Sequence, residues 1–240
     1  MNFKKIKQIK VNAKSQLKNN IFITFDTDWC SDEVLNYSLD LLNNYKVNST
    51  FFITNKTRLL ETMRKNSKIE LGIHPNFNPL LSGDFKYGKN INEVITYFKK
   101  IVPEAVSARS HSMTQNAHIL DSFEKNGIKF DCNTFIPISA NINLKPYKHW
   151  SRKIIKVPYF WEDHIHCIYG WKYDIKKFLI LDSIKVFNFH PIHIFLNTER
   201  IDRYKKSKRW IYNWKNLKKF RNSRYGTESF LIDLLNTKDK

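Results

Sequence analysis

An apolar run that ends in two carboxylates constrains this chain more than any other feature. Residues 21–29 read Ile-Phe-Ile-Thr-Phe-Asp-Thr-Asp-Trp, and the β-branched and aromatic side chains at their start predict a buried strand. Asp26 and Asp28 stand at its end. An ionised carboxylate is costly to bury unless a metal ion, a cation or hydrogen-bond donors pair with it. The run therefore predicts a functional site, although a plain strand end followed by a turn is the simpler interpretation.

The rest of the chain alternates between strand patterns and helix patterns. Short apolar runs predict strands over residues 49–54, 69–74, 105–111, 129–133, 154–161 and 184–190. Apolar side chains at helical spacing predict helices over residues 31–42, 59–65, 92–101, 117–125 and 227–235. Such alternation is typical of βαβ units, so we expect an α/β fold with about seven mainly parallel strands.

Composition limits the setting in which such a domain works. The 240 residues include enough apolar side chains, 42%, for a sizeable core. Cys30, Cys132 and Cys167 are far apart and form no CxxC pair, which favours neither a zinc–thiolate site nor a disulfide framework. A reducing, cytoplasmic setting fits this usage best. No stretch approaches the roughly 18 apolar residues of a membrane span.

The distribution of charge along the sequence predicts that the chain has three parts. Residues 1–20 are rich in lysine and lack the apolar core of a secretory signal, so we expect a basic lead-in. A barrel domain is expected over residues 21–198. Residues 199–240 are expected to form a basic helical extension packed on that domain.

The basic extension suggests a partner. Residues 200–224 hold eleven Lys and Arg and a single acid, Asp202, and Trp210, Tyr212 and Trp214 interleave with the bases. With a formal charge of +19, the chain is expected to attract polyanions or an anionic membrane surface, the latter at the inner membrane face. A solvated charged face is the simpler interpretation. Nucleic acid is the weaker alternative, because no recognised nucleic-acid-binding motif accompanies the charge.

Ionisable and polar side chains recur where the predicted strands stop. Catalytic groups gather at the carboxyl ends of strands in parallel α/β folds and barrels. Carboxylates and imidazoles are ligands for a divalent metal such as Zn²⁺, which lowers the pKa of a nearby water toward neutrality. The side chains at these strand ends are Asp26 and Asp28, His74 with Asn78, Arg109 and His111, and His190 with His193.

This set of motifs resembles the polysaccharide deacetylase (NodB-homology) family, carbohydrate esterase family 4. The resemblance rests on Thr-Phe-Asp-Thr-Asp at residues 24–28, Gly-Ile-His at residues 72–74, Arg109, and the strand that ends at His190. The local forms His-Pro-Asn-Phe-Asn and Arg-Ser-His are closest to deacetylase-like proteins of lipopolysaccharide and capsule biosynthesis. The resemblance implies a distorted (β/α) barrel. It also implies metal-dependent removal of an N- or O-acetyl group from a surface polysaccharide or a lipid-linked sugar.

The resemblance also implies a role for each matching residue. Asp26 would be the general base that takes a proton from the attacking water, and Arg109 would pair with it and hold its pKa down. His190 would be the general acid that protonates the leaving group. Asp28 and His74 would bind the metal, expected to be Zn²⁺ with Co²⁺ or Ni²⁺ as alternatives.

Two positions depart from the family's pattern. Thr27 separates aspartates that are usually adjacent, and Asn78 stands where a second ligating histidine is usual. Asn78 ligates through its amide oxygen, or another residue such as His111 replaces it, or the metal is held weakly. A non-catalytic, glycan-binding member of the fold is therefore an alternative, and hydrolysis of a different amide is another.

Further side chains are candidates for the substrate-binding wall. Trp161 could stack on a sugar face, although a structural cluster at a loop edge is the simpler interpretation. His190 and His193 flank Pro191 and Ile192, so we expect only one of the two histidines, His190, to point into the site. The residues assigned to substrate binding are His111, Trp161, Asp163 and His193.

Overall fold

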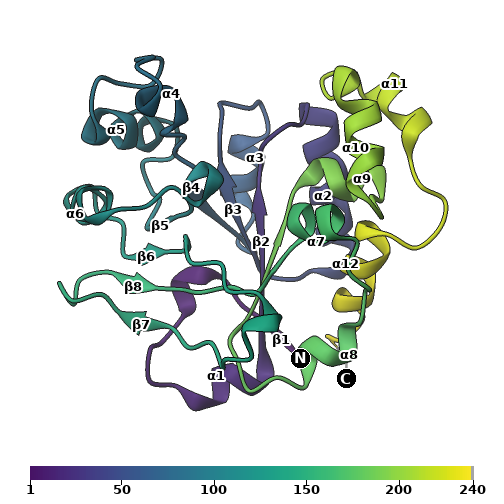
Figure 1. Cartoon of the computed structure of the whole chain (residues 1–240), viewed down its shortest axis with the longest axis horizontal. Coiled ribbons are helices and arrows are strands. Elements are labelled where there is room, and N and C mark those ends of the chain that lie inside the picture. Colours follow the sequence, from purple (N-terminus) through teal and green to yellow (C-terminus); the bar gives the residue numbers. More distant parts are fainter. Residues whose placement is uncertain (239–240) are drawn as a thin grey trace.

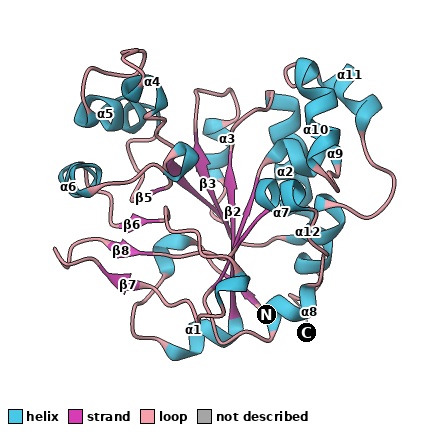
Figure 2. Cartoon of the chain, in the orientation of Figure 1, coloured by secondary structure: helices cyan, strands magenta, loops and turns pink. Residues whose placement is uncertain are grey.

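One mainly parallel sheet organises the structure, a computed structural model in which residues 1–238 are described. Figure 2 shows the longest strands near the centre with helices outside them, and several short strands at the left of the view. The strands are β1 (Asn2–Phe3), β2 (Asn20–Asp26), β3 (Ser49–Ile53), β4 (Ile69–Ile73), β5 (Ser107–Ala108), β6 (Phe130–Asp131), β7 (Tyr147–Lys148), β8 (Ile155–Lys156), β9 (Trp161–Glu162) and β10 (Lys185–Phe189).

The order of the strands forms an incomplete barrel. It runs β7-β8-β6-β5-β4-β3-β2-β10-β9, with β1 added beside the start of β2. All pairings are parallel except that of β7 with β8. The predicted fold class, a distorted (β/α) barrel, is confirmed. Residues 1–238 form ten strands rather than about seven, because short two-residue strands are present beside the predicted ones.

Helices surround the sheet (Figure 1). Those with clear helical spacing in the sequence form as predicted, within a few residues at their ends. The helices are α1 (Lys14–Asn19), α2 (Asp32–Tyr45), α3 (Leu60–Lys65), α4 (Asn78–Leu81), α5 (Ile91–Ile101), α6 (Ala117–Lys125), α7 (Asp163–Tyr169), α8 (Ile175–Leu179), α9 (Pro191–Leu196), α10 (Ile201–Ser207), α11 (Trp214–Leu217) and α12 (Thr227–Leu235).

The central strands are buried along nearly their whole length. Every residue of β3 and β10 is buried, as is β2 from Ile21 onward. Such continuous apolar runs are what a parallel sheet covered on both faces requires. Phe25 of β2 stacks on Phe51 of β3 with ring centroids 4.5 Å apart, so the strand that carries the two aspartates is firmly packed.

The prediction of one strand over residues 154–161 is wrong. The run forms β8, which pairs with β6, and β9, which pairs with β10 at the other edge of the sheet. Pro158 lies between them and has no N–H to donate to a ladder. This run therefore carries the chain across the opening of the barrel.

Both ends of the chain belong to the same core. β1 pairs with the start of β2, and Phe3, Ile6 and Ile9 are buried, so residues 1–20 are more than a basic lead-in. The amino group of Met1 donates to the carbonyl of Thr237 at 2.9 Å. In α12 the side chains of Phe230, Leu231, Leu234 and Leu235 are fully buried.

The basic segment after residue 199 is a series of short helical pieces. It comprises α10, a 3₁₀ turn at Lys208–Trp210, α11 and a second 3₁₀ turn at Lys218–Phe220. Among residues 1–238, none of the helices combines the length and the apolar character that crossing a bilayer demands.

Candidate active site and metal centre

The predicted strand-end side chains meet in one cavity. A cavity of about 260 Å³ lies where β2, β4, β5 and β10 end. Its lining includes Asp26, Asp28, His74, Arg109, His111 and His190. Residues up to 164 positions apart in the chain are therefore neighbours, as the carboxyl ends of parallel strands should be.

Asp26 is held as a buried carboxylate between two donors. Its Oδ1 accepts from Arg109 Nη1 at 3.1 Å, and its Oδ2 accepts from Asn188 Nδ2 at 2.8 Å. Burial alone would raise the pKa of Asp26, but the positive charges of Arg109, His74 and His190 together outweigh burial, and the pKa lies below its ordinary value. Asp26 is therefore ionised at neutral pH and able to accept a proton.

Arg109 is fixed by its surroundings. Its side chain is 1% exposed, and its guanidinium lies between the rings of Phe52 and Tyr159, at 4.6 and 4.5 Å from their centroids. Its Nε donates to the carbonyl of Cys132 at 3.1 Å. These contacts hold the guanidinium beside Asp26.

Three side chains next to Asp26 form a group with the donor set of a metal site. The Oδ2 atom of Asp28 lies 2.9 Å from Nε2 of His74 and 2.9 Å from Nδ1 of His111. One ligand atom from each residue lies within 4.8 Å of the other two. One carboxylate and two imidazoles are typical protein ligands of Zn²⁺ and related divalent ions.

The ring of His74 supplies an independent test of this assignment. The side chain is buried, yet neither ring nitrogen makes a hydrogen bond of acceptable geometry. The short distance from Nε2 to Asp28 is therefore proximity without alignment. A buried nitrogen without a partner is costly, and a cation shared with Asp28 and His111 would satisfy it. The residues present fit a divalent metal.

A second group of three potential ligands does not fit a metal site. Asp163, His190 and His193 also lie close together, but their polar atoms have partners. Asp163 accepts from the backbone N–H and from Nδ1 of His190, both at 2.6 Å. His193 lies 3.1 Å from Thr198 Oγ1 through Nδ1 and 2.9 Å from His164 Nδ1 through Nε2. This group orients His190.

Asn78 lies away from the metal-ligating group. It is the first residue of α4, it is exposed, and its amide donates to Ser112 Oγ at 3.3 Å. It does not line the cavity. His111, which opens the 3₁₀ turn His111–Met113 after β5, lies beside Asp28 and His74 instead.

His190 has the properties of a proton donor. Its ring stacks on Trp29 at 5.1 Å, and its Nε2 lies 4.0 Å from Asp26 Oδ2. Burial disfavours the charged ring, but the carboxylate of Asp163, with smaller contributions from Asp26 and Glu162, more than offsets burial and raises the pKa of His190 to about 10. Since Nδ1 is taken by Asp163, Nε2–H is the donor directed at the cavity.

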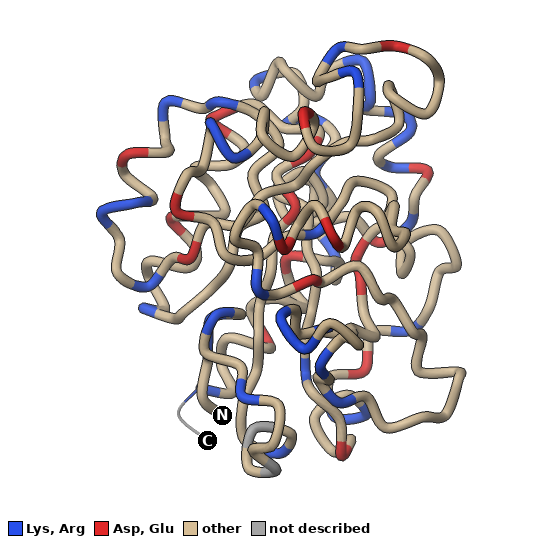
Figure 3. The backbone as a smooth tube through the Cα atoms, turned by 90° about the vertical axis from the view of Figure 1, so that its left-hand side faces the viewer, with Lys and Arg blue, Asp and Glu red and all other residues tan. Residues whose placement is uncertain are grey.

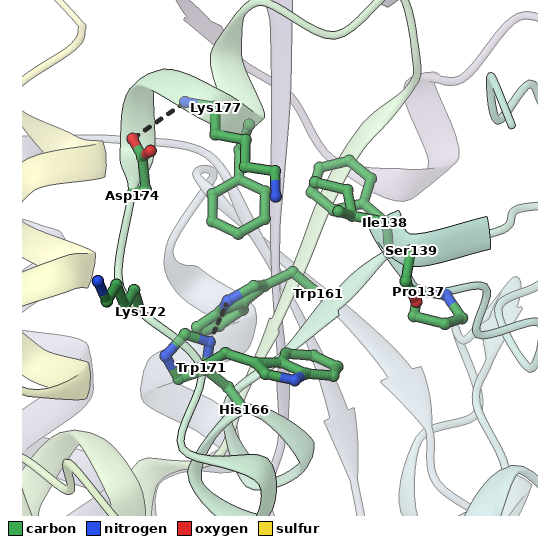
Figure 4. Close-up of a pocket in the computed structure, with 11 residues that line it drawn as sticks. Pro137, Ile138, Ser139, Trp161, His166, Trp171, Lys172, Asp174 and Lys177 are labelled. Atoms are coloured by element: carbon green, nitrogen blue, oxygen red, sulfur yellow. Dashed lines mark hydrogen bonds between the residues drawn. The ribbon is translucent and has the colours of Figure 1, made fainter. Parts of the chain in front are cut away.

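The structure does not bring Trp161, Asp163 or His193 to the wall of this cavity. Trp161 is fully buried and its Nε1 donates to Nδ1 of His166 at 3.1 Å. It faces a separate cavity of about 390 Å³, lined by aromatic, apolar and charged side chains, between Pro137–Ser139, α7 and α8 (Figure 4). Asp163 and His193 lie behind His190, as described above.

Several lining residues were not predicted. Glu162 lines the cavity where Trp161 was expected, because neighbouring residues of a strand point to opposite faces. It accepts from Tyr159 Oη at 3.0 Å, and burial raises its pKa. Asn188, which holds Asp26, had a usable signal: it is a polar residue inside an apolar strand, two positions before His190 and so on the same face.

Comparison with known proteins places these observations in a family. The family model described as "WbmS-like: Polysaccharide deacetylase" matches residues 23–208. The crystal structure of WbmS from Bordetella bronchiseptica, described as a candidate polysaccharide deacetylase involved in O-antigen biosynthesis, is 39% identical. The match covers 99% of this chain and 98% of that one, with a TM-score of 0.92. A search of curated proteins found no match.

Two more distant structures show the fold alone. A candidate polysaccharide deacetylase from Mycobacterium smegmatis is 13% identical over 91% of this chain and 85% of that one, with a TM-score of 0.52. A 4-alpha-glucanotransferase from Thermococcus litoralis is 11% identical over 89% of this chain and 38% of that one, with a TM-score of 0.51. Because a glucanotransferase shares the fold, the reaction must be argued from the cavity.

Proposed function

This chain belongs to the WbmS-like polysaccharide deacetylase family, and we propose that it removes acetyl groups from a sugar in a metal-dependent reaction. The observation that carries the proposal is the group Asp28, His74 and His111, in which both ring nitrogens of the buried His74 lack a hydrogen-bond partner, beside Asp26 and His190. A divalent cation bound there, with Zn²⁺ preferred and Co²⁺ or Ni²⁺ as alternatives, would polarise the acetyl carbonyl and acidify a nearby water.

The chain's own residues supply the proton transfers. Asp26 takes a proton from the water as the water oxygen bonds to the acetyl carbon, and Arg109 and Asn188 keep its carboxylate in place. His190 then gives the proton on Nε2 to the leaving nitrogen or oxygen as the bond from the acetyl carbon breaks. Asp163 holds the ring of His190 and favours its charged form. The products are acetate and a free amine or hydroxyl on the sugar.

For the substrate we propose a surface polysaccharide or its lipid-linked precursor, processed at the cytoplasmic face of a membrane. The proposal draws on the description of WbmS, which refers to O-antigen biosynthesis. The aromatic ring of Trp29, beside His190 at the cavity wall, offers a surface on which a sugar could pack.

Acetate release tests the proposal. Purified protein would be loaded with Zn²⁺, Co²⁺ or Ni²⁺ and incubated with acetylated amino-sugar oligomers, and acetate would be measured. We expect turnover that disappears on chelation and returns with metal. If the protein binds glycan but releases no acetate with any of the three metals, it is instead a non-catalytic glycan-binding protein.

The third ligand position can be tested by a pair of substitutions. His111→Ala is expected to lower bound metal to less than about a tenth of the wild-type stoichiometry, because two ligands rarely retain a divalent ion. Asn78→Ala is expected to leave the stoichiometry unchanged, since Asn78 is exposed and bonded to Ser112. Metal content by plasma mass spectrometry is the readout. The reverse result would make Asn78 the ligand.

The fall in activity at alkaline pH should report the deprotonation of His190. Its pKa of about 10 keeps the ring protonated at neutral pH, and activity should fall as the pH rises through that value. Asp163→Asn removes the largest of the contributions that raise the pKa of His190, while burial, which lowers it, remains. We therefore expect the alkaline fall in activity to begin at lower pH, and kcat at pH 8 to drop roughly 10²-fold.

The exposed Asp121→Asn is the matched control and should leave the profile unchanged. If the activity of Asp163→Asn falls at the same alkaline pH as that of the wild type, His190 is not the general acid.

A further inference from the structure

The positive charge of this protein is concentrated in one short segment. Residues 200–224 hold eleven Lys and Arg against one Asp, which accounts for +10 of the chain's +19 in about a tenth of its length. Residues 1–20 carry six further lysines and no acid, and over most of the remaining chain basic and acidic residues are interspersed (Figure 3). In the structure this segment forms α10, α11 and the two 3₁₀ turns, and we call its exposed side the basic surface. Its exposed bases are Arg200, Lys205, Lys206, Lys208, Arg209, Lys215, Lys218, Lys219 and Arg224.

These bases are not neutralised within the part of the chain that the structure describes. The bases of the segment that form ion pairs there are Arg203, with Glu199 at 2.5 Å, and Arg221, with Glu228 at 2.7 Å. Both are partly buried. An array of unpaired cations on short helices attracts a polyanion.

Aromatic side chains are exposed among the bases. Tyr212 is 72% exposed and Trp214 is 36% exposed, and Trp210 and Ile211 are partly exposed beside them. Trp and Tyr, with an apolar ring and a polar atom, favour the boundary between lipid and water. Lysine and arginine combined with such rings are the signature of a surface that lies on a membrane.

The basic surface borders the catalytic cavity. Tyr204 of α10 packs 5.8 Å from Trp29 and 6.0 Å from His164, and both of these line the cavity. Figure 1 shows α10 and α11 at the end of the sheet toward which β2 points. A surface that engages α10 and α11 would therefore lie near the cavity's edge.

We propose that the basic surface docks this protein on an anionic membrane, with the catalytic cavity directed at groups carried by that membrane. Membrane docking stands on the charge, exposure and aromatic side chains alone. The link to a lipid-linked sugar also rests on the proposed function. Nucleic acid is less favoured, because the surface adjoins a cavity built for a hydrolytic reaction at a sugar and carries no nucleic-acid-binding motif.

Vesicle co-sedimentation of the full chain tests the proposal. The probes are phosphatidylcholine vesicles with and without about 30% phosphatidylglycerol, at about 0.1 M and about 0.5 M salt. We expect binding only to the anionic vesicles, weakened by the higher salt. Equal binding to neutral vesicles, or binding to neither, would overturn the proposal.

A matched pair of variants locates the surface. The first changes Lys205, Lys208, Lys215 and Lys218 to Gln, and we expect binding to fall by at least about 100-fold, since each base near an anionic surface contributes roughly fivefold. The second changes the exposed Lys56, Lys65, Lys89 and Lys125 to Gln and so removes the same charge elsewhere. It should bind within about threefold of wild type. Equal losses in both would show that net charge, not this surface, is responsible.

Two readouts separate this proposal from the proposed function. Vesicle binding is measured without substrate, so an inactive protein can still bind. Acetate release from a soluble acetylated oligomer should be unchanged in the first variant, and its loss would show that these lysines contact substrate directly. A short RNA duplex that displaces the protein from vesicles at equal phosphate concentration would favour nucleic acid and contradict membrane docking.

Discussion

Asp26→Asn is expected to lower acetate release by at least about 10³-fold while the metal remains bound. The amide cannot accept the proton that the attacking water must lose. Asp26 is not one of the three side chains that form the metal-ligating group, so metal stoichiometry should stay near that of the wild type.

The same change leaves Arg109 buried without its counter-charge. Arg109 is 1% exposed and pairs with Asp26, so we expect the free energy of unfolding to fall by about 3 kcal/mol. Urea unfolding measures this loss, and activity is then compared at a temperature where both proteins are folded. A variant that is folded and metal-loaded, yet retains more than a tenth of wild-type turnover, would remove Asp26 from the role of base.

Asp28→Ala should abolish activity by a different route, through loss of the metal. Asp28 lies at hydrogen-bonding distance from both His74 and His111, so its removal leaves two imidazoles to hold the ion. We expect less than about a tenth of the wild-type metal and a loss of activity of at least about 10³-fold.

Comparison of the two variants decides the division of roles. Asp26→Asn should keep metal and lose turnover, whereas Asp28→Ala should lose both. If both variants keep metal equally, Asp28 is not a ligand. If both lose it equally, the carboxylate of Asp26 contributes to binding and the assignment of base and ligand is wrong.

The sequence was sufficient to predict the frame of the site. The long buried runs at β2, β3, β4 and β10 have no competing interpretation as surface segments, and polar residues at their ends stand out against them. The parallel arrangement then requires these ends to meet. Asp26, Asp28, Arg109 and His190 were therefore predictable as neighbours.

The third member of the metal-ligating group was not decided by the sequence. Asn78 and His111 both follow strand ends close to His74, and nothing in their spacing shows which one turns inward. The structure puts Asn78 on the exposed first turn of α4 and His111 in a 3₁₀ turn beside Asp28. Which of the two side chains turns inward depends on tertiary packing, and the pattern of residue types along the chain does not determine it.

Trp161 shows a second limit of residue patterns. Its assignment to the cavity assumed one continuous strand over residues 154–161. The break between β8 and β9 at Pro158 changes which strands this run contacts, and the face of Trp161 then depends on pairing with β10. A shift of one residue in a strand reverses its faces, so Glu162 rather than Trp161 lines the cavity.

Anomalous X-ray scattering at the zinc edge tests the central claim most directly. Crystals of the full chain grown with Zn²⁺ should give one strong peak bonded to Asp28, His74 and His111, with Asp26 and His190 beside it but not bonded to it. A peak among Asp163, His190 and His193, or no peak near Asp28 and His74, would contradict the account.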